Sequence, residues 1–155
     1  MGRFGFIVVS IALLQTTINA QTYKTYYPWE SDSVLVAWVI KKFADPKAKF
    51  VSVDKKKEKI GKENSINTSN SKLRRTARFT AFEMALKHYE VKESACTNRL
   101  KKIIRVLEMT PWKKHEYEEI LTFEEGFISL FPKRIEDDNL TKLFEYIDNS
   151  CKGKK

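Results

Sequence analysis

Asp32 is the carboxylate in this sequence that most invites a chemical interpretation, because it begins the most apolar helix that the sequence predicts. It could face a pocket beside Trp38 and the basic residues that follow. It could equally cap its own helix and stabilise the helix dipole. Lys41 and Lys42 come at the carbonyl end of the same predicted helix, where positive charge is favourable, so they are open to the same two interpretations.

No motif of a known catalytic or metal site accompanies these residues. The chain lacks CxxC, HExxH, GxGxxG, Walker and GxSxG patterns. His88 and His115 lack the convergent partners that a zinc site needs, so we interpret them as surface residues. Five glutamates between 116 and 125 lie close to basic residues, and helix-surface pairing accounts for them. The sequence therefore predicts no catalytic residue, no metal and no cofactor. An enzyme with an unrecognised active site is the alternative.

Residues 1–20 have the order of a secretory signal peptide. Arg3 precedes an apolar run from 4 to 14, and a polar stretch then leads to Ala20. The apolar run is about 11 residues long, whereas a helix needs about 20 to span a bilayer. We expect cleavage after Ala20, a mature protein that begins at Gln21 without a transmembrane segment, and a periplasmic or secreted location. An uncleaved N-terminal anchor is the alternative.

The composition of the chain favours one folded basic domain. Apolar and aromatic residues make up 42% of the sequence, which argues against disorder of the whole chain. The net charge is +9, and an exported basic domain meets anions such as a membrane surface, a cell-wall polymer or a small oxyanion. The charge could also serve only solubility. Export makes nucleic acid a poor partner, and the oligomeric state is left open.

The apolar patterns predict a single α+β domain over residues 21–151. It is predominantly helical, with about five helices and a small sheet of two or three short strands. Strands are expected at 22–27 and 50–53, where β-forming residues cluster. Spacings of three and four between apolar residues indicate five helices. They are expected at 31–44, 79–89, 93–108, 111–131 with a break near Thr122, and from a cap at Asp137 or Asp138 to Cys151.

Residues 54–75 differ in kind from their neighbours. Five lysines are followed by a run rich in asparagine and serine, and only Ile60 and Ile66 could be buried. This composition predicts a mobile, solvated basic loop. The loop opens a third class of function, an envelope-interaction protein. Residues 152–155 are expected to form a loose basic tail.

Cys96 and Cys151 each lie on the apolar face of a predicted helix. Antiparallel packing of those helices would bring the two thiols together, and an exported protein can form a disulfide. Two separate buried thiols are the alternative, because free cysteine behaves as a small hydrophobic residue. The sequence leaves this choice open.

The segment 32–50 carries a long series of residues in one register, without a gap: Asp32, Trp38, Ile40, Lys41, Lys42, Phe43, Asp45, Ala48 and Phe50. In this it resembles the chromate-resistance exported protein family, which is similar to the C-terminal domain of the chromate-resistance regulator. Weaker similarity follows at 80–86, at 100–108 and around Gly126. The resemblance therefore covers most of the mature chain.

The resemblance also implies what this chain lacks. The family's cysteine in the first segment falls at Val36, and its later histidine and cysteine fall at Arg75 and Thr80. Loss of these side chains implies that the chain does no metal or redox chemistry. The residues that remain imply non-catalytic binding of an oxyanion or an acidic partner: Asp32, Lys41, Lys42, Arg78 and Arg105, with Trp38 beside them. Convergence of these residues in a cleft would favour a site, and scatter would favour an interaction domain.

Overall fold

Two short parallel strands form the sheet of this α+β, mostly helical fold. The computed structural model describes residues 20–137 and 140–152. Strand β1 (Thr22–Tyr26) pairs with β2 (Lys49–Val53) from Thr22 opposite Lys49 to Tyr26 opposite Val53. The strands are parallel because a helix between them carries the chain back to the start of the sheet. The fold class that the sequence predicts is therefore confirmed. The predicted signal peptide lies outside the described residues, except for Ala20.

The connecting helix is the centre of the molecule. It consists of α1 (Ser31–Val39) and a wider π-helical turn, η1 (Ile40–Ala44). Every residue from 32 to 40 is buried, as expected from an apolar sequence on all sides. The apolar sequence of this helix also predicts that Phe43 is buried, and this prediction is wrong, since its side chain is 45% exposed. The π-turn has more residues per turn than an α-helix, so residues after Ile40 lie on a different face from the one that α-helical spacing predicts.

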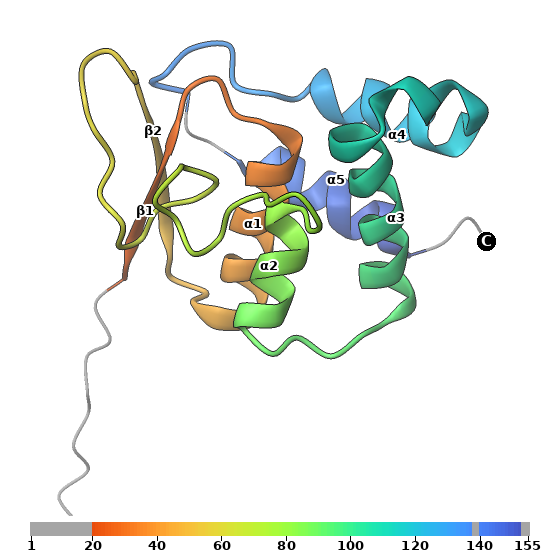
Figure 1. Cartoon of the computed structure of the whole chain (residues 1–155), viewed down its shortest axis with the longest axis horizontal. Helices are drawn as coiled ribbons and strands as arrows, with labels where there is room; N and C mark the ends of the chain where they lie inside the picture. Colours follow the sequence, from red (N-terminus) through yellow and green to blue (C-terminus); the bar gives the residue numbers. More distant parts are fainter. Residues whose placement is uncertain (1–19, 138–139, 153–155) are drawn as a thin grey trace, which may run out of the picture.

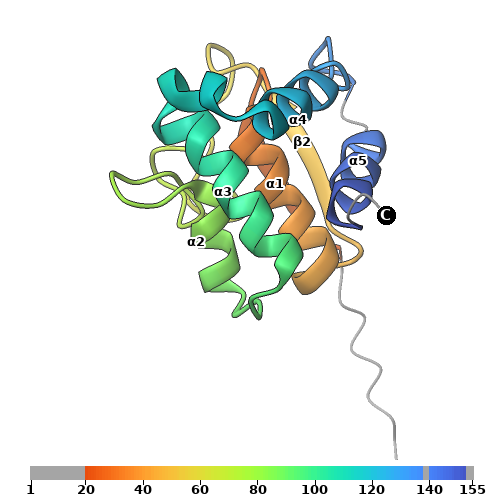
Figure 2. The same cartoon turned by 90° about the vertical axis from the view of Figure 1, so that its right-hand side faces the viewer.

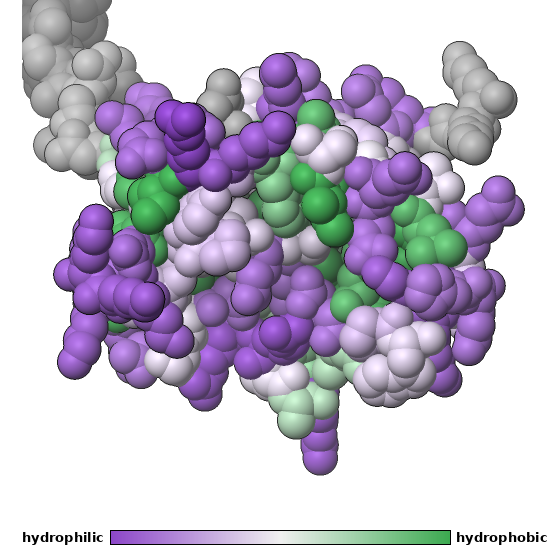
Figure 3. Space-filling view, turned by 90° about the horizontal axis from the view of Figure 1, so that it is seen from above, coloured by the Kyte–Doolittle hydropathy of each residue, from purple (hydrophilic) through white to green (hydrophobic). Residues whose placement is uncertain are grey.

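The remaining helices surround this central helix. They are α2 (Ala81–His88), α3 (Ala95–Met109), α4 (Glu118–Ile128) and α5 (Thr141–Cys151). Figures 1 and 2 show the sheet at one end of the molecule, α2 and α3 beside α1, and α4 lying across one end of α3. Among the described residues, no helix is long and apolar enough to cross a membrane. Figure 3 shows hydrophilic side chains over most of one face, with apolar groups in separate patches between them.

The helix predicted over 111–131 is interrupted earlier than expected. A short 3₁₀ helix, η2 (Pro111–Glu116), is separated from α4 by the extended backbone of Tyr117, so a break near Thr122 is wrong. Helix α5 begins after Leu140 and has no side-chain cap, so Asp137 does not cap it, and Asp138 lies outside the described residues. Phe79 is 43% exposed because α2 begins only after Thr80, which forms a capping box with Glu83.

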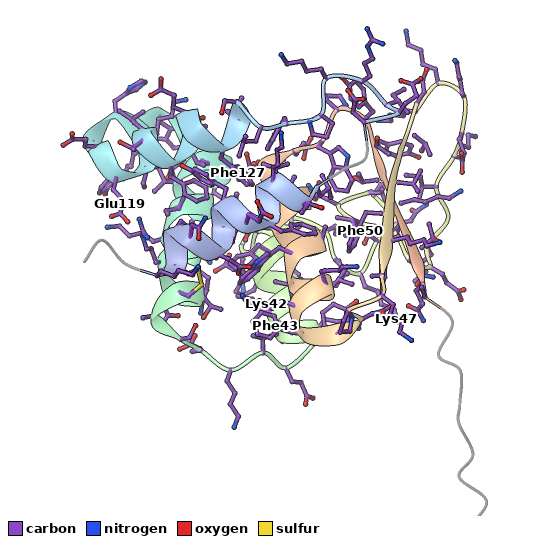
Figure 4. The ribbon with its side chains drawn as sticks, turned by 180° about the vertical axis from the view of Figure 1, so that it is seen from behind. Lys42, Phe43, Lys47, Phe50, Glu119 and Phe127 are labelled. Atoms are coloured by element: carbon purple, nitrogen blue, oxygen red, sulfur yellow. A yellow bond between two sulfur atoms is a disulfide. The ribbon has the colours of Figure 1, made fainter. Side chains whose placement is uncertain are left out.

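Aromatic contacts hold α5 against the rest of the fold. Phe50 of β2 meets Phe144 of α5 edge to face, with ring centroids 6.0 Å apart. Phe127 of α4 lies against Tyr146 of α5, at 6.0 Å. Figure 4 shows Phe50 on the strand and Phe127 between the two helices. A β-carbon on Gly126 would lie 2.5 Å from the Tyr146 hydroxyl oxygen, so the absence of a side chain there allows the helices to approach.

The segment 54–75 is packed more closely than its composition suggests. Ile60 and Ile66 are buried, as expected, and Leu73 is buried as well. The backbone of Lys24 in β1 bonds to this segment twice: its N–H donates to the Asn64 carbonyl oxygen, and its carbonyl oxygen accepts from the Ile66 N–H. The segment therefore covers the free edge of β1, and its second half is not a solvated loop. In the predicted tail, Lys152 is exposed and 153–155 lie outside the described residues.

A disulfide joins Cys96, at the start of α3, to Cys151, at the end of α5. The two Cα atoms are 4.8 Å apart, and the bond closes a loop with a sequence separation of 55. In the chain-entropy model, a loop of this size stabilises the fold by about 4 kcal/mol. Of the two arrangements that the sequence leaves open, the structure has the disulfide.

Candidate functional site

Asp32 caps a helix other than its own. Its carboxylate accepts hydrogen bonds from the backbone N–H groups of Ala81 and Phe82, both at 2.7 Å, at the start of α2. The N-cap of α1 is Glu30, whose side chain makes no capping hydrogen bond to the helix. The side chain of Asp32 is fully buried, so it fastens α1 to the first turn of α2. The expectation that Asp32 caps α1 is therefore wrong, although the chemistry of a carboxylate at a helix N-terminus is the same.

The environment of Asp32 raises its pKa to about 7. Burial is the largest cause, since it penalises the charged form, and the nearby Glu108 carboxylate raises the pKa further. The N–H groups of Ala81 and Phe82 and the charge of Arg75 lower it, but by less. Near neutral pH, Asp32 can therefore exist in both its protonated and its charged form. Because its side chain has no exposed surface, it has no contact with a ligand outside the fold.

Arg75 and Glu108 complete a charge cluster with Asp32. The Arg75 guanidinium donates to the Glu108 carboxylate at 2.5 Å and to the Glu108 carbonyl oxygen at 3.1 Å. Burial raises the pKa of Glu108, while Arg75 and the backbone N–H of Asp32 lower it. The cluster lies where the starts of α1 and α2 meet the end of α3. Its charges are satisfied within the protein.

The positions at which the resemblance places histidine and cysteine lie at this same cluster. Arg75 bonds Glu108, and Thr80 is the N-cap of α2, directly before the N–H groups that bond Asp32. In this chain a guanidinium and a hydroxyl occupy the two positions. Within residues 20–137 and 140–152, no group of three or more histidine, cysteine, aspartate or glutamate residues is placed to hold a metal ion.

Arg78 and Arg105 lie together on the outer side of the first turn of α2. Arg105 donates to the Glu83 carboxylate at 2.8 Å and to the Arg78 carbonyl oxygen at 2.9 Å. Both arginines are exposed. Asp32 approaches the same turn from the inside, so these three candidates share one region but not one cavity.

Trp38 and Lys42 meet at Asp148 of α5. The indole N–H of Trp38 donates to the Asp148 carboxylate at 3.1 Å, and Lys42 forms an ion pair with the same carboxylate. The Lys42 ammonium also lies 5.0 Å from the centre of the Trp38 ring. Figure 4 shows Lys42 and Phe43 at the end of the central helix. Lys41 donates instead to the Ala48 carbonyl oxygen at 3.1 Å. Both lysines thus have partners within the protein.

The six sequence candidates therefore lie in separate places. Asp32 is at the start of the α1–η1 helix, and Lys41 and Lys42 are at its end. Trp38 and Lys42 line a cavity of about 410 Å³ with Phe43, Asp148 and residues around the disulfide. Arg105 lies on α3, away from both lysines. Asp32, Lys41 and Arg105 do not converge in one cleft, and by the criterion stated above this scatter favours an interaction domain over a site made of these residues.

A different cavity gathers cations and hydroxyl groups. We call it the basic pocket. It has a volume of about 510 Å³ and lies between β1, two parts of the 54–75 segment and the end of α2. Its lining residues are Gln21, Tyr23, Lys62, Glu63, Asn64, Ser65, Lys72, Leu73, His88 and Tyr89. Among the described residues, neither Lys62 nor Lys72 forms an ion pair. Their charges are therefore available to an anion.

Two tyrosines form one wall of the basic pocket. Tyr23 donates to the Gln21 side-chain oxygen at 3.0 Å, and the hydroxyl oxygens of Tyr23 and Tyr89 are 3.4 Å apart. Burial raises the pKa of Tyr89, so its hydroxyl keeps its proton and can donate a hydrogen bond. A second cavity, of about 380 Å³, shares Gln21 and both tyrosines with the basic pocket. The tyrosine pair therefore lines both cavities.

Sequence reasoning missed the basic pocket because its parts are far apart along the chain. Tyr23 and Tyr89, for example, are 66 residues apart. Lys62 was treated as part of a solvated loop, and His88 as a surface residue. The usable signal was Ile66, one of the two residues of the loop that could be buried: because its side chain is buried, it holds the segment that contains Lys62 and Ser65 against the fold.

The model of the ChrB C-terminal domain family matches residues 24–149 of the chain. The matched range runs from β1 to near the end of α5 and includes the charge cluster and most of the basic pocket. Comparisons with curated proteins and with solved structures gave no significant match. The family match agrees with the resemblance seen in residues 32–50. The chain therefore belongs to the ChrB C-terminal domain family, which is associated with chromate resistance.

Proposed function

We propose that this family member is an exported, non-catalytic domain that binds the oxyanion part of a ligand, or an acidic partner, at the basic pocket. The observation that carries the proposal is the pair of lysines, Lys62 and Lys72, which line a cavity and have no ion-pair partner among the residues that the structure describes. Two ammonium groups beside hydroxyl and amide donors suit an anionic group.

The charge cluster supports a non-catalytic role. A general acid or base must reach the proton that it transfers. Asp32 has a pKa close to neutrality, but its carboxylate is enclosed and bonded to two backbone N–H groups. Glu108, whose pKa is also raised, is engaged by Arg75. Both carboxylates thus serve to join α1, α2 and α3.

Two observations support export. The disulfide between Cys96 and Cys151 is compatible with an oxidising compartment. Cleavage after Ala20 would create a new ammonium group at Gln21, whose backbone nitrogen lies 3.2 Å from the Asp45 carboxylate. The mature N-terminus would then gain an ion pair next to the basic pocket, which Gln21 also lines.

Thermal-shift measurements on the mature protein test the binding proposal. Phosphate, sulfate and chromate are added separately at constant ionic strength, because a ligand that binds only the folded state raises the melting temperature. At least one of these oxyanions should raise it. The double variant Lys62→Gln, Lys72→Gln should lose the effect. The control double variant Lys133→Gln, Lys142→Gln, which removes two exposed charges elsewhere, should keep it.

Two outcomes would contradict the proposal. One is that none of the three oxyanions changes the melting temperature of the unaltered protein. The other is that both double variants weaken the effect equally, which would mean that net charge, and not the basic pocket, determines binding.

An acidic macromolecular partner is the second candidate. Four consecutive or nearly consecutive lysines, Lys55, Lys56, Lys57 and Lys59, are all exposed in the turn that follows β2. Such a group of charges suits a polyanionic surface. Replacing these four lysines by glutamine should abolish binding to anionic vesicles if this candidate holds, and should leave binding of small oxyanions unchanged if the basic pocket is the site.

A further inference from the structure

We infer that the ligand of the basic pocket is an acidic carbohydrate, that is, a sugar carrying a phosphate or carboxylate group, and not a free inorganic oxyanion. The inference rests on the proposed function, in which the pocket binds an anion. It adds the chemical class of the molecule that carries the anionic group.

The size of the pocket is the first argument. A tetrahedral oxyanion occupies about the volume of two water molecules, or about 60 Å³. The basic pocket has about 510 Å³, so such an ion would leave most of it to solvent. Pockets for organic ligands commonly span about 300–1,000 Å³. The volume therefore suits a molecule of sugar size or larger.

The hydrogen-bonding groups of the pocket are the second argument. A fully ionised oxyanion such as sulfate only accepts hydrogen bonds, and hydrogen phosphate has no more than one or two O–H groups to donate, so such ions make little use of acceptors around them. The pocket nevertheless contains strong acceptors in the Glu63 carboxylate and the Gln21 side-chain oxygen. Sugar hydroxyls both donate and accept, so they can bond Glu63 and Gln21 while the anionic group lies against Lys62 and Lys72. The mixed lining fits an acidic sugar better than it fits a simple anion.

The apolar and rigid parts of the pocket are the third argument. Leu73 and the rings of His88 and Tyr89 line the cavity, and the two rings meet edge to face with centroids 4.8 Å apart. Such surfaces can cover the carbon–hydrogen faces of a sugar ring. Tyr23, Ser65 and Leu73 are buried, and backbone hydrogen bonds between Lys24 and the 64–66 segment fix the wall. A wall that is ordered before binding reduces the entropy cost of holding a ligand.

Isothermal titration calorimetry on the disulfide-intact protein tests the inference. The probes are glucose 6-phosphate, glucuronate, glucose and inorganic phosphate, each at the same ionic strength. At least one of the two acidic sugars should bind tenfold or more tightly than both phosphate and glucose. The two acidic sugars distinguish a phosphate group from a carboxylate.

Variants of the pocket locate the binding. Lys62→Gln with Lys72→Gln should weaken acidic-sugar binding at least tenfold. Tyr89→Phe should weaken it severalfold, whereas Tyr117→Phe, which alters a tyrosine outside the pocket, should not. Circular dichroism verifies that each variant is folded. If a variant does not fold, the ranking of the four probes on the unaltered protein still decides.

Each remaining outcome overturns the inference in a recognisable way. If phosphate binds as tightly as both acidic sugars, the carbohydrate is excluded while anion binding stands. If glucose binds as tightly as glucose 6-phosphate and glucuronate, the pocket does not recognise the phosphate or carboxylate group of the sugar. If none of the four probes binds and the oxyanions of the thermal-shift test are also without effect, the proposed function fails together with the inference.

Discussion

Replacing Asp32 by asparagine should remove most of the pH dependence of stability between pH 4 and 7. The pKa of this carboxyl rises from 3.8, its ordinary value, to about 7 in the folded protein, mainly because of burial. The folded state therefore holds a proton that the unfolded state has released in this range. The contribution of Asp32 to the free energy of unfolding is therefore fully present below about pH 4 and is lost as the pH rises to about 7.

The size of the effect follows from the two pKa values. A tenfold change in an ionisation constant corresponds to about 1.4 kcal/mol, so the rise from 3.8 to about 7 corresponds to about 4 kcal/mol. Asparagine keeps the shape of the side chain and does not ionise. Its amide nitrogen cannot accept, so one of the bonds from Ala81 and Phe82 is lost, at a cost of about 1–2 kcal/mol at every pH. The variant should be less stable than the unaltered protein at pH 4 and more stable at pH 8.

Urea denaturation at intervals from pH 4 to pH 8 measures the pH at which the variant becomes more stable than the unaltered protein. The free energies of unfolding of the two proteins are subtracted, so that the groups they share cancel. Glu136→Gln, an exposed carboxylate, serves as the control and should follow the unaltered protein. A difference between Asp32→Asn and the unaltered protein that stays constant within about 0.5 kcal/mol over the whole range would refute the reasoning.

Three further predictions concern the core, the disulfide and the N-terminus. Trp38→Ala should lower the free energy of unfolding by about 3–5 kcal/mol in urea denaturation, because the side chain is 2% exposed. Phe43→Ala should lower it by about 1 kcal/mol or less, and equal losses for the two variants would contradict the prediction. Replacing Cys96 and Cys151 by serine should lower stability by about 4 kcal/mol, and titration in denaturant should find no free thiol before reduction. Mass spectrometry of exported protein should show a chain that begins at Gln21, and an intact Met1 would rule out cleavage.

The fold could be predicted because its signals are local. The apolar residues of α1, and the spacing of Leu100 and Ile103 in α3, are visible within one or two helical turns. Phe43 was misplaced because a π-turn intervenes, and no short pattern announces such a turn. The pairing of Cys96 with Cys151 was left open since it depends on how two helices pack, which a periodic pattern does not contain.

The candidate site was harder to predict because it is assembled from distant segments. Asp32 was identified as the most notable carboxylate, but its partners Ala81 and Phe82 are 49 and 50 residues away, so its role as the cap of another helix was not visible. Lys62 and Lys72 looked like parts of a solvated loop. Their place in a cavity depends on backbone bonds between the 64–66 segment and β1, which the composition of the loop does not reveal.

The most direct test of the anion-binding proposal is an NMR titration of the ¹⁵N-labelled mature protein with phosphate and with glucose 6-phosphate. The basic pocket should contain the amides whose shifts change most, namely those of Lys62–Ser65, Lys72, Leu73, His88 and Tyr89. Changes concentrated instead around Lys42 and Asp148, or around Arg78 and Arg105, would place the anion at one of the sites that the sequence suggested. The absence of changes with either ligand would contradict anion binding by this domain.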